Sequence, residues 1–338
     1  MDVQQQVSLK QFNTFGIDVK AAYMAAFSSV EELSGLLSNH SYKNLPVLIL
    51  GGGSNVLFTK DFEGIVLRNN IPGIQIINES KDSVLVKAGS GVVWHNLVTW
   101  CIDQGLGGIE NLSLIPGKSG AAPIQNIGAY GVELKDSFES LEAYHKINRE
   151  LITFTKRECE FGYRDSVFKR HLKDHFVITS ITLSLTRSPQ LHLTYGAIEQ
   201  ELQKMGVEKP DVKMVSQAVC NIRRSKLPDP VQIGNAGSFF KNPEISNSQF
   251  EKLKSDFPGI VAYALPDGNV KLAAGWMIEQ CGWKGKVVGN TGAHVNQALV
   301  LVNYGQATGN EIRELAKMIQ ASVLDKFGVT IEPEVNII

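Results

Sequence analysis

A short apolar run that ends directly in three glycines is the strongest constraint on how the first part of this chain folds. The run 45–50 has the length and composition of a buried strand, and Gly51–Gly53 follow it at once. Successive glycines let backbone N–H groups converge on an anion, and Ser54 and Asn55 add side-chain donors. We therefore expect a pyrophosphate-type ligand at this turn. A plain tight turn is the alternative, and the spacing argues against a Rossmann fingerprint because Val56 stands where a further glycine is needed.

Composition limits where such a ligand is held. Glycine is in excess, with 31 of 338 residues, about 9% against a usual 7% or so. The net charge is −1, from 33 Lys and Arg against 34 Asp and Glu, so no global basic field attracts nucleic acid or an anionic membrane surface. An anionic ligand must therefore be bound locally. The length predicts two or three domains.

The cysteines and the N-terminus predict a cytoplasmic protein. The four cysteines are scattered, without the paired spacing of a zinc site, and the seven histidines show no metal-binding spacing, so we expect no metal. The first residues, 1–6, lack the basic and apolar regions of a signal peptide, and no apolar run is long enough to span a membrane.

The hydrophobic pattern predicts both helices and sheets. Helices are expected over 30–39, 92–101, 197–205, 212–226, 272–281 and 309–327, the last capped by Asn310. Strands are expected over 45–50, 64–67, 73–77, 84–88, 141–144, 151–154, 176–185, 298–302 and 330–338.

The stretch 111–131 follows neither period, yet it carries several apolar residues between glycines and prolines. Long ordered loops of this kind in compact domains are usually functional, so we expect it to line a ligand, with a structural Ω-loop as the alternative. It is not a P-loop, because Leu112 occupies the position of the required glycine.

Four further patterns contain candidate catalytic or binding residues, and each also has a simpler structural interpretation. Arg164, after Tyr163, suits a carboxylate, whereas an Arg164–Asp165 surface pair is the alternative. The cations of 223–226 suit a diphosphate or are a solvated helix face. Ser238 is a proton donor or a turn serine. Glu332 and Glu334 share one face of a strand, as exposed carboxylates or, if buried, as an acid.

Taken in order, these motifs resemble the UDP-N-acetylenolpyruvoylglucosamine reductase (MurB) family over nearly the whole chain. The motifs that carry the resemblance are Phe12-Asn13-Thr14-Phe15-Gly16, Gly51–Asn55, Ile115–Gly131, Gly162-Tyr163-Arg164, Lys226-Leu227-Pro228, Gly237–Pro243, Ala273-Ala274-Gly275-Trp276 and Glu332-Pro333-Glu334-Val335. The segment around Tyr195 is similar to the longer type I form, whose tyrosine loop closes over substrate.

The resemblance implies an α+β architecture. A vanillyl-alcohol-oxidase-like (PCMH-type) FAD-binding fold in two subdomains, 1–68 and 69–222, would precede a C-terminal α+β substrate-binding domain, 223–338, whose terminal strand returns Glu334 to the active site. The resemblance also implies a monomer. Family members usually continue beyond the terminal Glu-Val strand, so we expect that strand to be frayed here.

The resemblance implies a reaction of peptidoglycan precursor synthesis. NADPH reduces non-covalently bound FAD, and the reduced N5 passes hydride to the methylene carbon of UDP-N-acetylglucosamine enolpyruvate, giving UDP-N-acetylmuramate. Arg164 would neutralise the developing enolate, Glu334 would support it, and Ser238 would protonate the carbanion. The alternatives are another FAD-linked oxidase and a catalytically dead flavin- or nucleotide-sugar-binding protein.

The remaining site residues follow from the same resemblance. Those expected to bind FAD are Gly51, Gly52, Gly53, Ser54, Asn55, Pro116, Gly117, Ser119, Gly120, Pro123, Ile124, Gln125, Asn126 and Gly128. Those expected to bind substrate are Tyr130, Tyr163, Tyr195, Arg223, Lys226, Asn242 and Gln297. Lys118 and Ser119 stand where small or apolar residues are commoner in the family.

Overall fold

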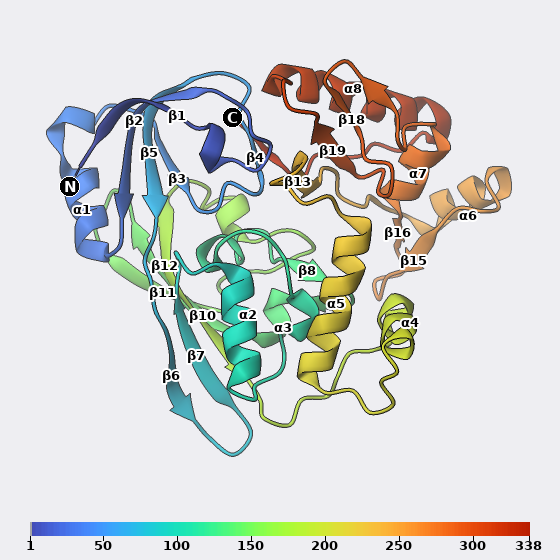
Figure 1. Cartoon of the computed structure of the whole chain (residues 1–338), viewed down its shortest axis with the longest axis horizontal. Helices are drawn as coiled ribbons and strands as arrows, with labels where there is room; N and C mark the ends of the chain where they lie inside the picture. The colour runs from blue at the N-terminus through green and yellow to red at the C-terminus, as the bar shows by residue number, and fades with distance from the viewer. Residues whose placement is uncertain (1) are drawn as a thin grey trace. The chain divides into compact units, whose positions relative to one another are not determined.

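The chain forms two compact units, each assembled from segments far apart in the sequence (Figure 1). The structure, a computed structural model, describes residues 2–338. The first unit comprises the segment up to Val7 together with 21–52 and 63–225, and the second comprises 8–20, 53–62 and 226–338. The expected division into 1–68, 69–222 and 223–338 stays a prediction.

Two sheets form the framework of the first unit. The smaller has the order β1-β2-β5-β3 and the larger the order β11-β10-β12-β7-β6. The strands are β1 (Gln4–Ser8), β2 (Lys20–Phe27), β3 (Val47–Leu50), β5 (Phe62–Asn69), β6 (Ile74–Glu79), β7 (Val84–Gly89), β10 (Phe138–His145), β11 (Leu151–Thr155) and β12 (Phe176–Leu185), with the hairpin of β8 (Gly128–Ala129) and β9 (Val132–Glu133). The helices are α1 (Val30–Ser38), α2 (Trp94–Asp103), α3 (Leu134–Ser137), α4 (Gly196–Lys204) and α5 (Val212–Lys226).

The larger sheet buries one face against α2. Val86, Leu97 and Ile181 are completely buried in one cluster that joins the helix to the central strands. The strand β12 is almost continuously apolar or small, as expected of a strand covered on both faces. The predicted run 45–50 is the parallel partner of β5, with Val47 opposite Ile65, and it delivers the glycine turn at its carboxyl end.

The second unit consists of short strands around one long helix. Its elements are β4 (Val56–Leu57), β13 (Gly234–Ser238), β14 (Glu244–Ile245), α6 (Asn247–Asp256), β15 (Ala262–Ala264), β16 (Val270–Leu272), α7 (Ala274–Gln280), β17 (Val287–Val288), β18 (Thr291–Ala293), β19 (Val300–Asn303), α8 (Gly309–Phe327) and β20 (Asn336–Ile337). The sheet β13-β19-β18-β17 contacts α8 through β18 and β19. Five short 3-10 helices complete the described chain, at Lys10–Phe12, His40–Tyr42, Glu110–Leu112, Ser119–Ala121 and Val167–Lys169.

The terminal segment differs from its prediction. The expected strand over 330–338 is reduced to an isolated bridge at Pro333 and to β20, which pairs in parallel with β4. The expectation of a frayed end is therefore wrong: Asn336 pairs with Val56, and the Ile338 backbone N–H donates to Leu57 O at 2.9 Å.

The start of α8 also differs. Its N-cap is Thr308, not Asn310: the Thr308 hydroxyl accepts from the Glu311 backbone N–H, and the Glu311 carboxylate accepts from the Thr308 N–H at 2.7 Å. This is a capping box, in which two helix-end donors are satisfied reciprocally. Among residues 2–338, no helix is both long enough and apolar enough to cross a membrane.

We predict that Thr308→Ala lowers the free energy of unfolding by about 1 kcal/mol, because it leaves the first turn of α8 without its acceptor. Asn310→Ala is the matched control, since the Asn310 side chain binds Thr59 O and does not cap the helix. Urea denaturation of both variants is the measurement. An equal or larger loss in Asn310→Ala would contradict the assignment of the cap.

Candidate functional site

In the first unit, the glycine turn lies backbone to backbone against the loop predicted to bind flavin. A Cβ added to Gly52 would lie 3.1 Å from Gly117 Cα, and one added to Gly51 would lie 3.7 Å from Lys118 Cβ. The two predicted loops therefore meet with no side chain between Gly52 and Gly117. This leaves backbone atoms as the surface that a ligand would contact.

The loop is anchored to the segment that follows β7. The Ser119 N–H donates to Val92 O at 2.8 Å and the Gly120 N–H to Ser90 O at 3.0 Å. The Ser119 hydroxyl donates to Gly89 O, and the residue is completely buried. The side chain of Ser119 is therefore engaged with the protein, and this anchoring fixes the position of the loop.

Lys118 and Asn69 form a second anchor, and sequence reasoning missed Asn69. Lys118 Nζ donates to Asn69 O and to Asn70 Oδ1, each at 2.7 Å. The buried Asn69 side chain donates to Ile178 O and accepts from the Ser90 hydroxyl. Burial lowers the pKa of Lys118, and the nearby Arg68 lowers it further. No motif marks Asn69, which ends β5 two residues beyond the predicted strand 64–67.

Asn126 holds the far end of the loop. Its side chain is completely buried, and it donates to Glu133 Oε2 at 3.1 Å and to Gly162 O at 3.0 Å while accepting from the Lys135 N–H. The Ser166 hydroxyl donates to Ile124 O, and the Asn126 N–H donates to Pro123 O. The Asn126 amide, predicted to contact flavin, thus shapes the loop in which Gln125 lies.

Arg164 is held against the same loop. Its Nη2 donates to Gly128 O at 2.5 Å, and its Nη1 lies 4.0 Å from Glu133 Oε1. The guanidinium stands 5.2 Å from the ring centre of Tyr163, and only 18% of the side chain is exposed. The alternative of an Arg164–Asp165 pair is wrong, because Asp165 pairs with Arg170 at 2.9 Å.

Three predicted substrate residues also meet in the first unit. Tyr130 and Tyr195 pack edge to face with ring centres 5.4 Å apart, and Tyr195 directly precedes α4. Arg223, on α5, interacts electrostatically with Tyr130, and its Nε donates to Leu114 O at 3.2 Å. Burial raises the pKa of Tyr130, an effect that Arg223 partly opposes, and burial lowers the pKa of Arg223. The cluster joins an aromatic surface to a cation.

In the second unit, the last glycine of the turn contacts the loop Phe12–Phe15. Gly53 has φ +64°, and a Cβ there would lie 1.9 Å from Phe12 O. The Thr14 N–H donates to Gly53 O at 3.0 Å, and Thr14 O accepts from the Asn235 N–H at 3.0 Å. This loop therefore connects the turn that continues into Ser54 with the strand that ends at Ser238.

Ser238 ends β13 as an exposed residue before two buried aromatics. Phe239 and Phe240 are 0% and 1% exposed, with ring centres 5.1 Å apart, and Phe15 packs edge-on to Phe239. The preceding Gly237 has φ +71° and donates its N–H to Asn235 Oδ1 at 2.9 Å. The buried phenylalanines fix the backbone while the serine faces outward.

Glu334 is brought to the same strand. Its N–H donates to Phe239 O at 2.7 Å, and the Lys241 N–H donates to Glu332 O at 2.9 Å, so the two chain segments pair around Ser238 and Glu334. On the other side, Asn55 Nδ2 donates to Glu334 O at 3.3 Å. Glu332 has a side chain 72% exposed, paired with Lys241, as an ordinary surface carboxylate.

Two of the other predicted substrate residues meet at the first turn of α7. Asn242 Oδ1 accepts from the Ala274 N–H at 3.0 Å, and a Cβ on Gly275 would lie 3.2 Å from Gln297 Oε1. Lys226, the last residue of α5, is exposed.

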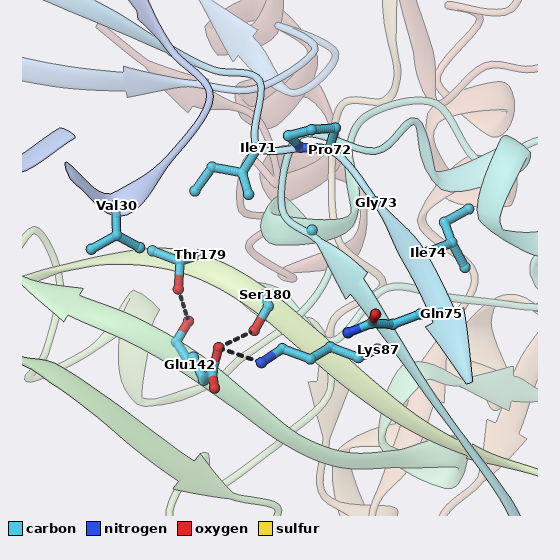
Figure 2. A pocket seen from close by; sticks show the side chains of 11 residues that line it. Val30, Ile71, Pro72, Gly73, Ile74, Gln75, Lys87, Glu142, Thr179 and Ser180 are labelled. Atoms are coloured by element: carbon cyan, nitrogen blue, oxygen red, sulfur yellow. Dashed lines mark hydrogen bonds and ion pairs between the residues drawn. The ribbon is translucent and has the colours of Figure 1, made fainter. Parts of the chain in front are cut away.

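A hollow in the first unit lies apart from these motifs. Figure 2 shows its polar floor, where Glu142 pairs with Lys87 at 2.7 Å and accepts from the Ser180 hydroxyl at 2.8 Å. Its volume is about 310 Å³, and no predicted site residue lines it. Within residues 2–338, no group of three or more His, Cys, Asp or Glu side chains is arranged to hold a metal ion.

Two family models match the chain. Residues 21–146 match an FAD binding domain, and residues 229–338 match the C-terminal domain of UDP-N-acetylenolpyruvoylglucosamine reductase. These matches confirm the predicted α+β class, with a PCMH-type FAD-binding fold followed by a distinct C-terminal domain. They leave the roles of individual residues as predictions.

Individual proteins are similar over the whole chain. The UDP-N-acetylenolpyruvoylglucosamine reductase of Flavobacterium johnsoniae is 50% identical, with 100% of each chain covered. That of Pseudomonas aeruginosa is 49% identical, with 100% of this chain and 99% of the relative covered. The crystal structure of the Thermus caldophilus enzyme aligns with a TM-score of 0.68 at 24% identity, covering 100% of this chain and 99% of the other, which supports the fold.

We predict that Gly53→Ala removes most of the bound flavin, because a Cβ there would overlap Phe12 O. Gly16→Ala is the matched control: Gly16 has φ +67°, and nothing lies within 4 Å of its added Cβ. The left-handed backbone costs each alanine about 1 kcal/mol, so only Gly53→Ala suffers the additional overlap. Flavin absorbance per protein and denaturation curves distinguish them, and equal flavin loss in both would contradict the steric argument.

Proposed function

The chain belongs to the UDP-N-acetylenolpyruvoylglucosamine reductase family, and from this membership we propose a residue-level mechanism for its reaction. It is a UDP-N-acetylmuramate dehydrogenase, an FAD-dependent oxidoreductase of peptidoglycan precursor synthesis. Its substrates are UDP-N-acetylglucosamine enolpyruvate and NADPH. We further propose that it is a cytoplasmic monomer of the type I form; the four free cysteines suit a reducing compartment.

The residues present fit FAD. Gly52 and Gly117 approach without side chains, and Gly53 turns in a left-handed conformation, which leaves backbone N–H groups as donors for a pyrophosphate. We assign the glycine turn and the loop 116–128 to hold it. FAD held there would supply the redox chemistry, the transfer of a hydride from NADPH to the methylene carbon of the enolpyruvyl group.

Arg164 stabilises the negative charge that develops on the substrate during the reaction. Hydride addition to the methylene carbon leaves an electron pair on the adjacent carbon, which the attached carboxylate delocalises as an enolate. A guanidinium is a planar fork of donors that matches a carboxylate, and partial burial strengthens its effect on developing charge. The bond from Arg164 to Gly128 O holds that fork at the loop.

Ser238 donates the proton that completes the reduction, and Glu334 assists. The single observation that carries this assignment is the backbone pairing of Phe239 O with the Glu334 N–H at 2.7 Å, because it holds the two side-chain positions on adjacent chain segments. A serine hydroxyl is a weak acid, but an enolate is a strong base and needs only a well-placed donor. The exposure of Ser238 gives the hydroxyl access to solvent for reprotonation.

The substrate is held by the remaining predicted residues. The Tyr130–Tyr195 pair offers an aromatic surface, with Tyr163 beside Arg164. Arg223 and Lys226 supply positive charge for a diphosphate, and Asn242 and Gln297 supply amides.

The function is tested by separating the two half-reactions. Anaerobic NADPH should bleach the flavin spectrum of the purified protein, and UDP-N-acetylglucosamine enolpyruvate should then restore it. Flavin that stays reduced would refute the reductase assignment. Rapid reoxidation by oxygen with alcohol or sugar turnover would indicate an FAD-linked oxidase, and absence of bound flavin would refute both.

We predict that Ser238→Ala leaves reduction of the flavin by NADPH nearly unchanged and slows reoxidation by the enolpyruvyl substrate by about 10²- to 10⁴-fold, the usual contribution of a general acid. Stopped-flow absorbance measures both steps. In deuterated water, the product should carry deuterium at the carbon bearing the carboxylate. Equal losses in both half-reactions would mean that Ser238 has only a structural role.

A further inference from the structure

The last strand of the chain returns to the glycine turn through Asn336. The Asn336 backbone N–H and its side-chain amide both donate to Asn55 O, at 3.1 and 3.0 Å. A carbonyl oxygen has two lone pairs, and Asn336 supplies a donor to each. Any residue would supply the backbone bond, but only the side chain of Asn336 supplies the second.

The connection is reciprocal. Asn55 Nδ2 donates to Glu334 O at 3.3 Å, so Asn55 is bonded to the chain on both sides of Val335. Val335 is itself buried, 5% exposed. These contacts hold residues 334–336 against the end of the glycine turn.

The opposite edge of the same segment is bonded to the Ser238 strand. The Glu334 N–H donates to Phe239 O at 2.7 Å, so Glu334 lies between Phe239 and Asn55 in the hydrogen-bond network of the second unit. A shift of the segment away from Asn55 would displace the Glu334 backbone, and its carboxylate with it.

We propose that Asn336 is a positioning residue, which couples the flavin-binding turn to the carboxylate of Glu334. Through Asn55, its amide keeps the turn and Glu334 in fixed register, so that the order imposed on the turn by bound FAD also places the carboxylate. The inference rests on the proposed function for the roles of Asn55 and Glu334.

The test compares Asn336→Ala with Thr59→Val. Asn336→Ala removes one donor to Asn55 O but keeps the backbone bond, and Asn336 is exposed, so the variant should fold. Thr59→Val removes the hydroxyl that donates to Ile338 O at 2.8 Å, which loosens the same terminal segment beyond Asn55 and Glu334. The readouts are the FAD dissociation constant, the rate of each half-reaction and the thermal midpoint.

We expect Asn336→Ala to weaken FAD binding several-fold and to slow reoxidation by substrate about tenfold, since small misplacements of catalytic groups cost this much or more. Reduction by NADPH, at matched flavin occupancy, should change little. Thr59→Val should lower the thermal midpoint by a similar amount and leave all three functional readouts near those of the unmodified protein.

Two further variants test whether the effect on reoxidation depends on a hydrogen-bond donor in the side chain at position 336. Asn336→Ser keeps a donor and should recover part of the reoxidation rate, whereas Asn336→Asp places a carboxylate against Asn55 O and should be worse than alanine. If Asn336→Ala does not fold, the comparison of the serine and aspartate variants tests the positioning role of Asn336 instead.

The inference is overturned if Asn336→Ala behaves like Thr59→Val, if both half-reactions slow equally, or if the serine and aspartate variants do not differ. Failure of the unmodified, flavin-loaded protein to be reoxidised by substrate would instead overturn the proposed function. The two failures are therefore distinguishable.

Discussion

The close backbone contact between Gly53 and Phe12 is the constraint on which the site in the second unit depends. The loop that makes it is shaped by the buried Asn13, whose side chain donates to Leu9 O and Ile17 O and accepts from the Ile17 N–H. Thr14 then bonds both to Gly53 and to the strand of Ser238. One short loop thus sets the position of the turn and of the serine, which explains how a Phe-Asn-Thr-Phe-Gly motif with no reactive group can contribute to the candidate site.

The long elements of the fold could be predicted from the sequence because their periodicity repeats over several turns. The helices over 212–226 and 309–327 were predicted with the bounds that the structure has. The strand β2 was not predicted, because Lys20–Phe27 is rich in alanine and alternates poorly between polar and apolar residues. The two- and three-residue strands of the second unit are too short to carry a period, and tertiary contacts define them.

The residues of the candidate site also differ in whether the sequence could predict them. Gly53 and Ser238 belong to local motifs, and the resemblance to the reductase family identified them from neighbouring residues. Asn69 and Asn336 belong to no motif. The side-chain amide of each donates to a backbone carbonyl oxygen. Because every residue type has such a carbonyl, no particular partner residue marks the contact in the sequence. Asn336 and its acceptor Asn55 are 281 positions apart in the sequence, so only the folded chain brings them together.

The second unit is built from 8–20, 53–62 and 226–338, and this order has a consequence for its synthesis. The segments that carry Thr14 and Asn55 leave the ribosome early, but Asn235 and Glu334, to which these two residues bond, are made much later. Domains generally fold as units during synthesis. Gly53 can pair with Thr14 early, but the side-chain amide and the carbonyl oxygen of Asn55 must remain in water until residues 334–336 have been translated.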